Sequence, residues 1–321
     1  MDECYLYRLP NELLLYLFAP LPTPELVPLT VLSRRVYIIL LRILHNRIVT
    51  AAELQSHTLL LECFHPSAKL TEPPYFCTYH GTDGLSRYED STSILGDPKR
   101  LGELHNMYSR FRPYRRELEP GGRRVLPRPG DVPGSRTFPG TVQDRHKGDT
   151  VKQILGLEAH ELFTQLVAQT NLVKIGPRNG LFTCFVGVEE GVLRVWRDWL
   201  KDMDAKGRIT RATLEVETAE DMDKGKGVSK EVPVADMDIE DPRILWVTSS
   251  KNTGIRFNVK ERMLRRDAPI MMRADEESAV SYEIEYDELL IRTSYLLLML
   301  EKSRVQEDNA SGKAIVFGSF G

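Results

Sequence analysis

The chain is poor in cysteine and lacks the spacings that hold metals. Its 321 residues include four cysteines, Cys4, Cys63, Cys77 and Cys184, and no two of them form a CxxC pair. In a chain of this length we expect four reduced thiols rather than a disulfide framework or a zinc site. The seven histidines are scattered, and none belongs to an HExxH pattern. We therefore predict no metal and no cofactor.

Long apolar runs and strong charge are also missing. The longest apolar runs, such as residues 295–300, are far too short to span a bilayer. The first ten residues, MDECYLYRLP, have neither a basic start nor a signal-peptide cleavage pattern. The net charge of -3, with 28% charged residues, calls for neither nucleic acid nor a membrane as partner. We expect a soluble protein of the cytoplasm or the nucleus.

Catalytic motifs are absent as well. Ser67, His80 and Asp83 supply the residue types of a nucleophilic triad, but no GxSxG turn surrounds the serine. The run Gly81-Thr82-Asp83-Gly84 is typical of a turn. A cryptic hydrolase would need a constellation that the sequence does not contain, so we predict a protein that is not an enzyme.

What the chain does have is leucine, concentrated in residues 9–48 and divided by prolines. A first helix is predicted after Pro10, with Leu13, Leu14, Leu17 and Phe18 at helical spacing, and it must end before Pro20 and Pro22. Thr23-Pro24-Glu25 is a helix start, with Thr23 as N-cap, and Pro28 limits this second helix. A third helix is expected from Thr30 or Ser33, with a buried stripe formed by Val36, Ile39, Leu40, Ile43 and Leu44.

Such a three-helix unit is too small to bury all its leucines by itself. Residues 9–48 also hold four arginines against two glutamates, a net charge of +2. Either the rest of the chain covers the remaining apolar surface, or a partner does, and the charge favours an acidic, apolar partner.

The same residues resemble an F-box. The matching positions are Leu9, Pro10, Glu12, Leu13, Leu17, Phe18, Leu21, Leu26 and the run Leu32-Ser33-Arg34-Arg35-Val36-Tyr37. The resemblance covers about 40 of the 321 residues, with departures at Pro28 and at Leu32, where valine is commoner. It implies a module, residues 5–48, that binds a Skp-family adaptor and through it a cullin-based ubiquitin ligase. The adaptor-binding residues it implies are Leu9, Pro10, Glu12, Leu13, Leu17, Phe18, Leu21, Leu26, Ser33 and Arg34.

The remainder of an F-box protein usually holds the substrate. Three stretches, at 59–85, 173–200 and 286–301, are similar to a set of F-box proteins from filamentous fungi. That resemblance implies kinship and no particular substrate, so the target protein stays open.

Residues 52–305 read as a β-rich domain. Hairpins are predicted in 171–188, in 180–200 with its turn at Glu189-Glu190-Gly191, and in 244–259, and residues 280–286 alternate strictly. Residues 287–304 fit a strand better than a helix. The predicted fold class is α+β: a three-helix F-box followed by an antiparallel β-sandwich-like domain, with an open barrel as the alternative. Two inserts, 87–147 and 202–241, and the tail 306–321 are predicted to be disordered or loose.

One strand of this domain carries candidate substrate-binding residues. Trp196 stands between Arg194 and Arg197, and the two arginines fall on opposite faces of the expected strand. They cannot both be buried unpaired, so one is expected to find a carboxylate and the other to reach a ligand. Most of the domain's large aromatic residues should be core, and the arginine run 110–128 should be a solvated loop. The alternative function is a carbohydrate- or lipid-binding module that acts with the adaptor but outside the ligase.

Overall fold

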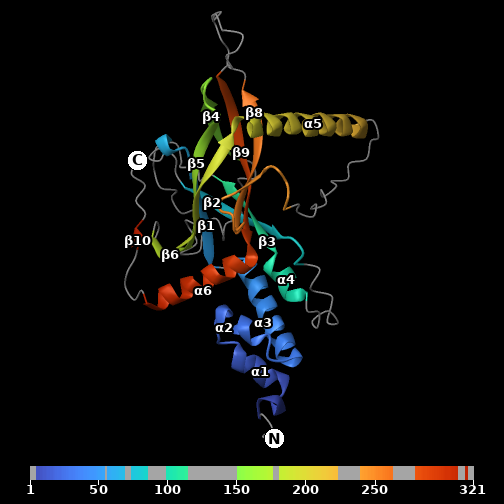
Figure 1. Cartoon of the computed structure of the whole chain (residues 1–321), viewed down its shortest axis with the longest axis vertical. Helices are drawn as coiled ribbons and strands as arrows, with labels where there is room; N and C mark the ends of the chain where they lie inside the picture. Colours follow the sequence, from blue (N-terminus) through green and yellow to red (C-terminus); the bar gives the residue numbers. More distant parts are fainter. Residues whose placement is uncertain are drawn as a thin grey trace, which may run out of the picture.

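The computed structural model describes residues 5–54, 56–68, 74–85, 99–114, 150–175, 181–222, 239–262, 279–309 and 315–316. The protein is α+β. A helical unit, residues 11–52, occupies one end, a large antiparallel sheet occupies the other, and the C-terminal helix α6 crosses between them (Figure 1). None of the described helices is both long enough and apolar enough to cross a membrane.

Prolines divide the helical unit where the sequence predicts. A 3-10 turn, η1 (Tyr5–Arg8), precedes α1 (Asn11–Phe18), α2 (Thr23–Leu29) and α3 (Arg34–Ala52), and Pro10 and Pro22 are the residues just before α1 and α2. Ser33 caps α3, since its Oγ accepts a hydrogen bond from the backbone N–H of Val36 at 3.2 Å. The predicted stripe of α3 is buried against residues of α1 and α2: Leu14, Phe18, Leu26, Val36, Ile39, Leu40, Ile43 and Leu44.

Two details of α2 differ from the prediction. Thr23 is the first helical residue rather than the N-cap, because its hydroxyl bonds Glu301 of α6 instead of the helix's own N–H groups. Pro28 lies inside α2 and does not end it before Leu29. A proline close to a helix end removes few hydrogen bonds, so this short helix tolerates it.

The β region is one antiparallel sheet. Its strands are β1 (His57–Phe64), β2 (Tyr75–Thr82), β3 (Tyr108–Tyr114), β4 (Val151–Leu157), β5 (Phe163–Ile175), β6 (Leu181–Trp196), β7 (Ile244–Trp246), β8 (Thr253–Arg262), β9 (Val280–Arg292) and β10 (Ile315–Val316). The order is β10-β6-β5-β1-β2-β3-β9-β8-β7, and β4 pairs with the first half of β9. A second 3-10 turn, η2 (Pro66–Ala68), follows β1. The predicted antiparallel architecture is confirmed.

The sheet nearly closes on itself. Val247, just after β7 at one end of the strand order, lies against Gly191 of β6 near the other end, and Thr248 Oγ1 donates a hydrogen bond to Glu189. The strands therefore join in a single curved sheet, for which the open-barrel alternative is a better description than two facing sheets. Its core includes Phe111, Phe257 and Tyr286, all almost fully buried.

Gly191 is the residue where the predicted turn is wrong. β6 runs without interruption from 181 to 196, with Gly191 opposite Ala168 of β5. A Cβ at position 191 would lie 2.8 Å from both the backbone O and the Cγ1 of Val247. The glycine marks a close approach of two segments and not a change of chain direction.

The segment 287–304 was predicted as a strand and is only partly one. β9 ends at Arg292, which pairs with Tyr108, the first residue of β3. Thr293 N–H then donates to the carbonyl of Met107 at 2.8 Å, and α6 (Thr293–Asn309) begins because no neighbouring strand continues. Leu296, Leu297 and Leu300 of α6 are buried.

Ordered elements also occur in the predicted inserts and tail. The first insert contains α4 (Arg100–His105) and β3, and α5 (Arg197–Met222) extends into the second. β3 is built from the start of the arginine run, so this part is not the solvated loop that was predicted. The charge of Arg110 is compensated by Asp83 at 3.0 Å. Pro113 is tolerated in the strand because it lies beyond Phe111, the last residue of β3 that pairs with β9. The tail contains the end of α6 and β10, which pairs with β6. Residues 87–98 and 115–147 of the first insert, 223–238 of the second, and 310–314 and 317–321 of the tail lie outside the described residues, and what was predicted there remains a prediction.

Replacing Gly191 by alanine should destabilise the protein by about 1–3 kcal/mol, because the new methyl group must push against a backbone carbonyl. Chemical unfolding in urea measures this loss. Gly187→Ala on the same strand is the control, because a Cβ there meets only Asn171 Oδ1 at 3.9 Å, and it should change stability by about 0.5 kcal/mol or less. Equal stability of the two variants would contradict this account of sheet closure.

Three of the four cysteines are buried free thiols, as predicted: Cys63, Cys77 and Cys184; Cys4 lies outside the described residues. Burial raises the pKa of Cys63 to about 12 and also raises the pKa of Cys77. Both thiols are therefore protonated and unreactive at pH 8. Iodoacetamide labelling at pH 8, read by peptide mass spectrometry, should leave both cysteines unmodified in the native protein and modify them in urea. Rapid native labelling of either would show that the core opens around it.

Candidate functional site

The first helix is apolar on two faces. Leu14 and Phe18 point inward and are buried in the helical unit, whereas Leu13, Tyr16 and Leu17 have exposed fractions of 50%, 80% and 50%. Positions 13, 16 and 17 share one side of an α-helix. We call these three side chains the docking face. A helix that is apolar all round is normally covered on every side.

Further exposed apolar side chains follow soon after in the sequence. Val27 of α2 is 41% exposed, and Val31 and Leu32, between α2 and α3, are 86% and 57% exposed. Six of the fourteen exposed large apolar side chains of the described residues thus fall between positions 13 and 32. Such a concentration is typical of a surface that another protein covers.

The adaptor-binding residues predicted from the sequence divide by exposure. Pro10, Glu12, Leu13, Leu17 and Arg34 are exposed, and Leu9, Leu21 and Ser33 are half-buried. Phe18 and Leu26 are buried within the helical unit. The structure therefore brings together an exposed set that a partner can touch, and an inner set that holds the helices in place.

The N-terminal ends of α1 and α3 are joined by a residue that the sequence did not single out for this role. Arg35 Nε donates to Asn11 Oδ1 at 2.9 Å, and its guanidinium also donates to the carbonyl of Leu9. Arg34 and Arg42 remain exposed, as do Glu12 and Glu25. The exposed arginines lie in the same unit as the docking face and preserve the positive balance expected there.

The helical unit is tied to α6 by a set of contacts that we call the Glu301 joint. Glu301 accepts hydrogen bonds from Thr23 N–H at 3.0 Å, Thr23 Oγ1 at 2.6 Å and Arg47 Nη1 at 3.0 Å. Arg47 Nη2 also donates to the carbonyls of Ala19 and Leu21, at 2.8 and 2.6 Å. One partly buried ion pair therefore joins α2, α3 and the turn after α1 to the C-terminal helix. No local pattern signals a contact across 278 positions, and sequence reasoning missed it.

A second exposed cluster, the aromatic patch, lies on the hairpin of β5 and β6. Phe163 is directly opposite Trp196, with ring centroids 5.1 Å apart, and the Arg194 guanidinium carbon lies 4.9 Å from the centre of the Phe163 ring. Trp196 is 47% exposed. A cation beside two exposed aromatic rings suits recognition of a peptide or a sugar ring. The sequence identified Arg194 and Trp196 but missed Phe163, their cross-strand neighbour.

Arg197, the third predicted substrate contact, is instead buried. Its Nε donates to the carbonyl of Glu161 at 3.0 Å, and its guanidinium also donates to the carbonyl of Glu158. It holds the turn before β5 against the start of α5, so we assign it a structural role.

The dismissed triad residues do not meet. Ser67 Oγ bonds His65 Nδ1 at 2.6 Å, His80 Nδ1 bonds Glu288 Oε1 at 3.0 Å, and Asp83 pairs with Arg110. Within the described parts of the chain, no group of three or more His, Cys, Asp or Glu residues could hold a metal ion.

Comparison of the chain with family models, with curated proteins and with solved structures gave no match.

Removing the carboxylate of the Glu301 joint should destabilise the protein. Glu301→Ala leaves a partly buried Arg47 without its counter-charge, which costs about 1–3 kcal/mol. Lys152→Ala, which removes a more exposed ion pair with Glu283, is the control and should cost about 0.5 kcal/mol or less. Urea unfolding measures both. If the two variants are equally stable, the joint does not hold the helical unit in place.

Proposed function

We propose that this protein is an F-box substrate receptor. Its helical unit binds a Skp-family adaptor, and its β region recruits a target protein to a cullin-based ubiquitin ligase. The observation that carries the proposal is the uncovered docking face of α1, Leu13, Tyr16 and Leu17, within the stretch that resembles an F-box. The β region leaves these side chains uncovered, so they are accessible to a partner protein.

Charge supports the same partner class. The helical unit has more arginines than glutamates, and Arg34 and Arg42 are exposed. An acidic adaptor with an apolar groove would complement both the sign of this charge and the leucines of the docking face. Glu12 is an exposed acidic residue in the first turn of α1, and it directly precedes Leu13 of the docking face in the sequence.

The arrangement of the two surfaces suits recruitment. The docking face lies in the helical unit at one end of the molecule, and the aromatic patch lies on β5 and β6 of the sheet, on the other side of α6 (Figure 1). The Glu301 joint fixes the helical unit on α6, so a target held at the patch would face the ligase in a defined orientation. Catalysis belongs to other subunits of that ligase in this proposal.

The aromatic patch also supports a second candidate. Phe163 and Trp196 with Arg194 could hold a carbohydrate or a lipid head group, and the adaptor-bound protein would then act outside the ligase. Capture of the full chain with adaptor separates the two functions. Cullin in the same complex supports the substrate receptor, and adaptor without cullin supports the second candidate.

Charge placed in the docking face should abolish adaptor binding. In the full chain, Leu13→Asp combined with Leu17→Asp buries two carboxylates at the interface and should weaken adaptor binding about 100-fold or more. Binding to a purified Skp-family adaptor by surface plasmon resonance measures this change. Both side chains are half exposed, so the variant should retain native circular dichroism.

The matched control is Val305→Asp on α6, a helical surface position that is 60% exposed and far in sequence from the docking face. It should bind adaptor like the unmodified chain. Adaptor affinity that survives the double change at 13 and 17 would show that α1 is not the adaptor-binding helix.

A further inference from the structure

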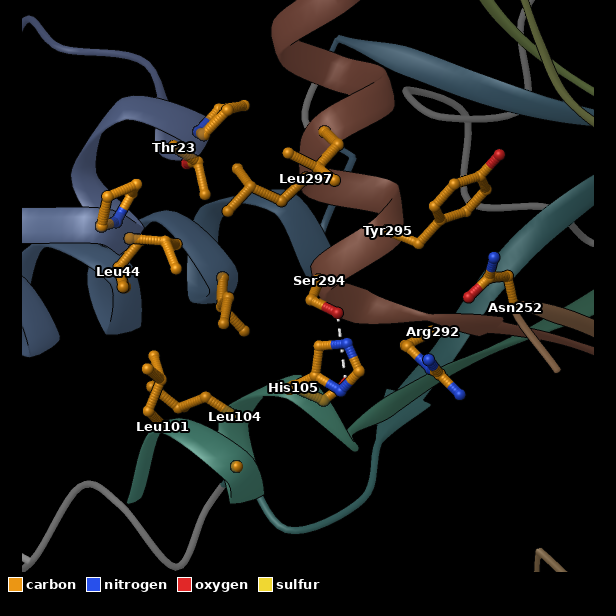
Figure 2. A pocket seen from close by; sticks show the side chains of 16 residues that line it. Thr23, Leu44, Leu101, Leu104, His105, Asn252, Arg292, Ser294, Tyr295 and Leu297 are labelled. Atoms are coloured by element: carbon orange, nitrogen blue, oxygen red, sulfur yellow. Dashed lines mark hydrogen bonds between the residues drawn. The ribbon is translucent and has the colours of Figure 1, made fainter. Parts of the chain in front are cut away.

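A groove of about 620 Å³ opens where the helical unit meets α4 and α6. Leu44 and Ile48 of α3, Leu101 and Leu104 of α4 and Leu297 of α6 form its aliphatic walls (Figure 2). This volume lies within the range of sites that hold small organic ligands. The groove is separate from the docking face on α1 and from the aromatic patch on β5 and β6.

The groove has an apolar side and a polar side. In Figure 2, Leu44, Leu101 and Leu104 lie on one side, and Asn252, Arg292 and Tyr295 lie on the other. Arg292 and His105 are its basic side chains, and its lining contains no aspartate or glutamate. The lining is therefore largely apolar, and the few ionisable side chains at its polar side favour negative over positive charge.

Arg292 is incompletely satisfied. Its Nη2 donates to Tyr108 Oη at 3.0 Å and to the carbonyl of Ser250 at 3.2 Å. Its Nε is buried without an acceptor, and no carboxylate of the described residues pairs with this guanidinium. Both N–H groups of Nη2 are used by these two acceptors and Nε is enclosed, so a ligand carboxylate in the groove would compensate the guanidinium by charge attraction rather than by a paired N–H contact.

We infer that the groove binds a small amphipathic acid, with an aliphatic body along the leucines and a carboxylate toward Arg292. A sugar or a nucleotide would leave polar groups unpaired against the leucine walls. A purely apolar molecule would leave the charge of Arg292 uncompensated. The inference does not depend on the proposed adaptor binding, because no residue of the docking face lines the groove.

Gly102 lies at the groove and can take a side chain without a clash at its Cβ. It lines the groove within α4, and a Cβ at this position would meet no atom within 4 Å. Gly102→Phe therefore adds a large side chain at the groove wall without a clash at its Cβ and should narrow the ligand space. Gly156→Phe on β4 is the matched control, because a Cβ there also meets nothing within 4 Å and the residue is not part of the groove.

The test titrates decanoate, below its micellar concentration, into the full chain by isothermal calorimetry. We expect one decanoate per chain, unchanged binding to Gly156→Phe, and binding at least about tenfold weaker to Gly102→Phe. Absence of binding to the unmodified chain, or equal binding to the two phenylalanine variants, overturns the inference.

The head group is tested separately with 1-decanol, which has the same chain and no charge. The unmodified protein should bind decanoate about tenfold or more tightly than decanol, and Arg292→Gln should remove this preference. The comparison on the unmodified chain needs no variant, so it holds even if Arg292→Gln folds poorly. Equal affinity for the acid and the alcohol overturns the assignment of a carboxylate ligand.

Discussion

Glu301 sets how the two ends of this chain are placed. It lies on α6, near the end of the sequence, and holds Thr23 and Arg47 near the beginning. The same helix is fixed to the sheet, because Tyr295 Oη donates to the carbonyl of Val188 at 2.8 Å and Ser303 Oγ donates to Cys184 Sγ at 3.0 Å. One helix therefore bonds both the helical unit and β6. These contacts of α6, together with Leu41, Ile48 and Ala51 of α3 in the core of the sheet region, hold the surfaces of the helical unit in a fixed direction relative to the sheet.

β6 has a second role, as the strand that both closes the sheet and presents side chains to solvent. Gly191 allows the backbone of Val247 to approach, and in doing so joins the two ends of the strand order. Three and five residues later, Arg194 and Trp196 point away from the core on the same strand. A closed sheet has few freely exposed edges and holds such side chains rigidly. The aromatic patch is thus built on a strand that is held by its pairing with β5 and by the approach of Val247.

How far the sequence predicts this structure depends on where the deciding contact lies. The helical unit was predictable because its signals are local: prolines at the breaks and a cap at Ser33. The start of α6 was not predictable, since residues 287–304 fit a strand better than a helix and the end of the strand depends on how far β3 extends beside it. Gly191 was misassigned for a similar reason, because the atom that requires a glycine belongs to Val247. For the candidate site, the motif named the residues, but only packing separates exposed Leu13 from buried Phe18.

The short helix α2 takes part in the Glu301 joint, the groove and the exposed apolar surface of the helical unit. Thr23 bonds Glu301, and Pro24, Val27 and Pro28 line the groove, while Val27 is also one of the exposed apolar residues of the helical unit. A ligand in the groove and a protein on the helical unit would therefore both act on α2. If either shifts this helix, each must change the affinity of the other by the same factor, because linkage between two sites is reciprocal. If the Glu301 joint keeps α2 in place, the two sites bind independently.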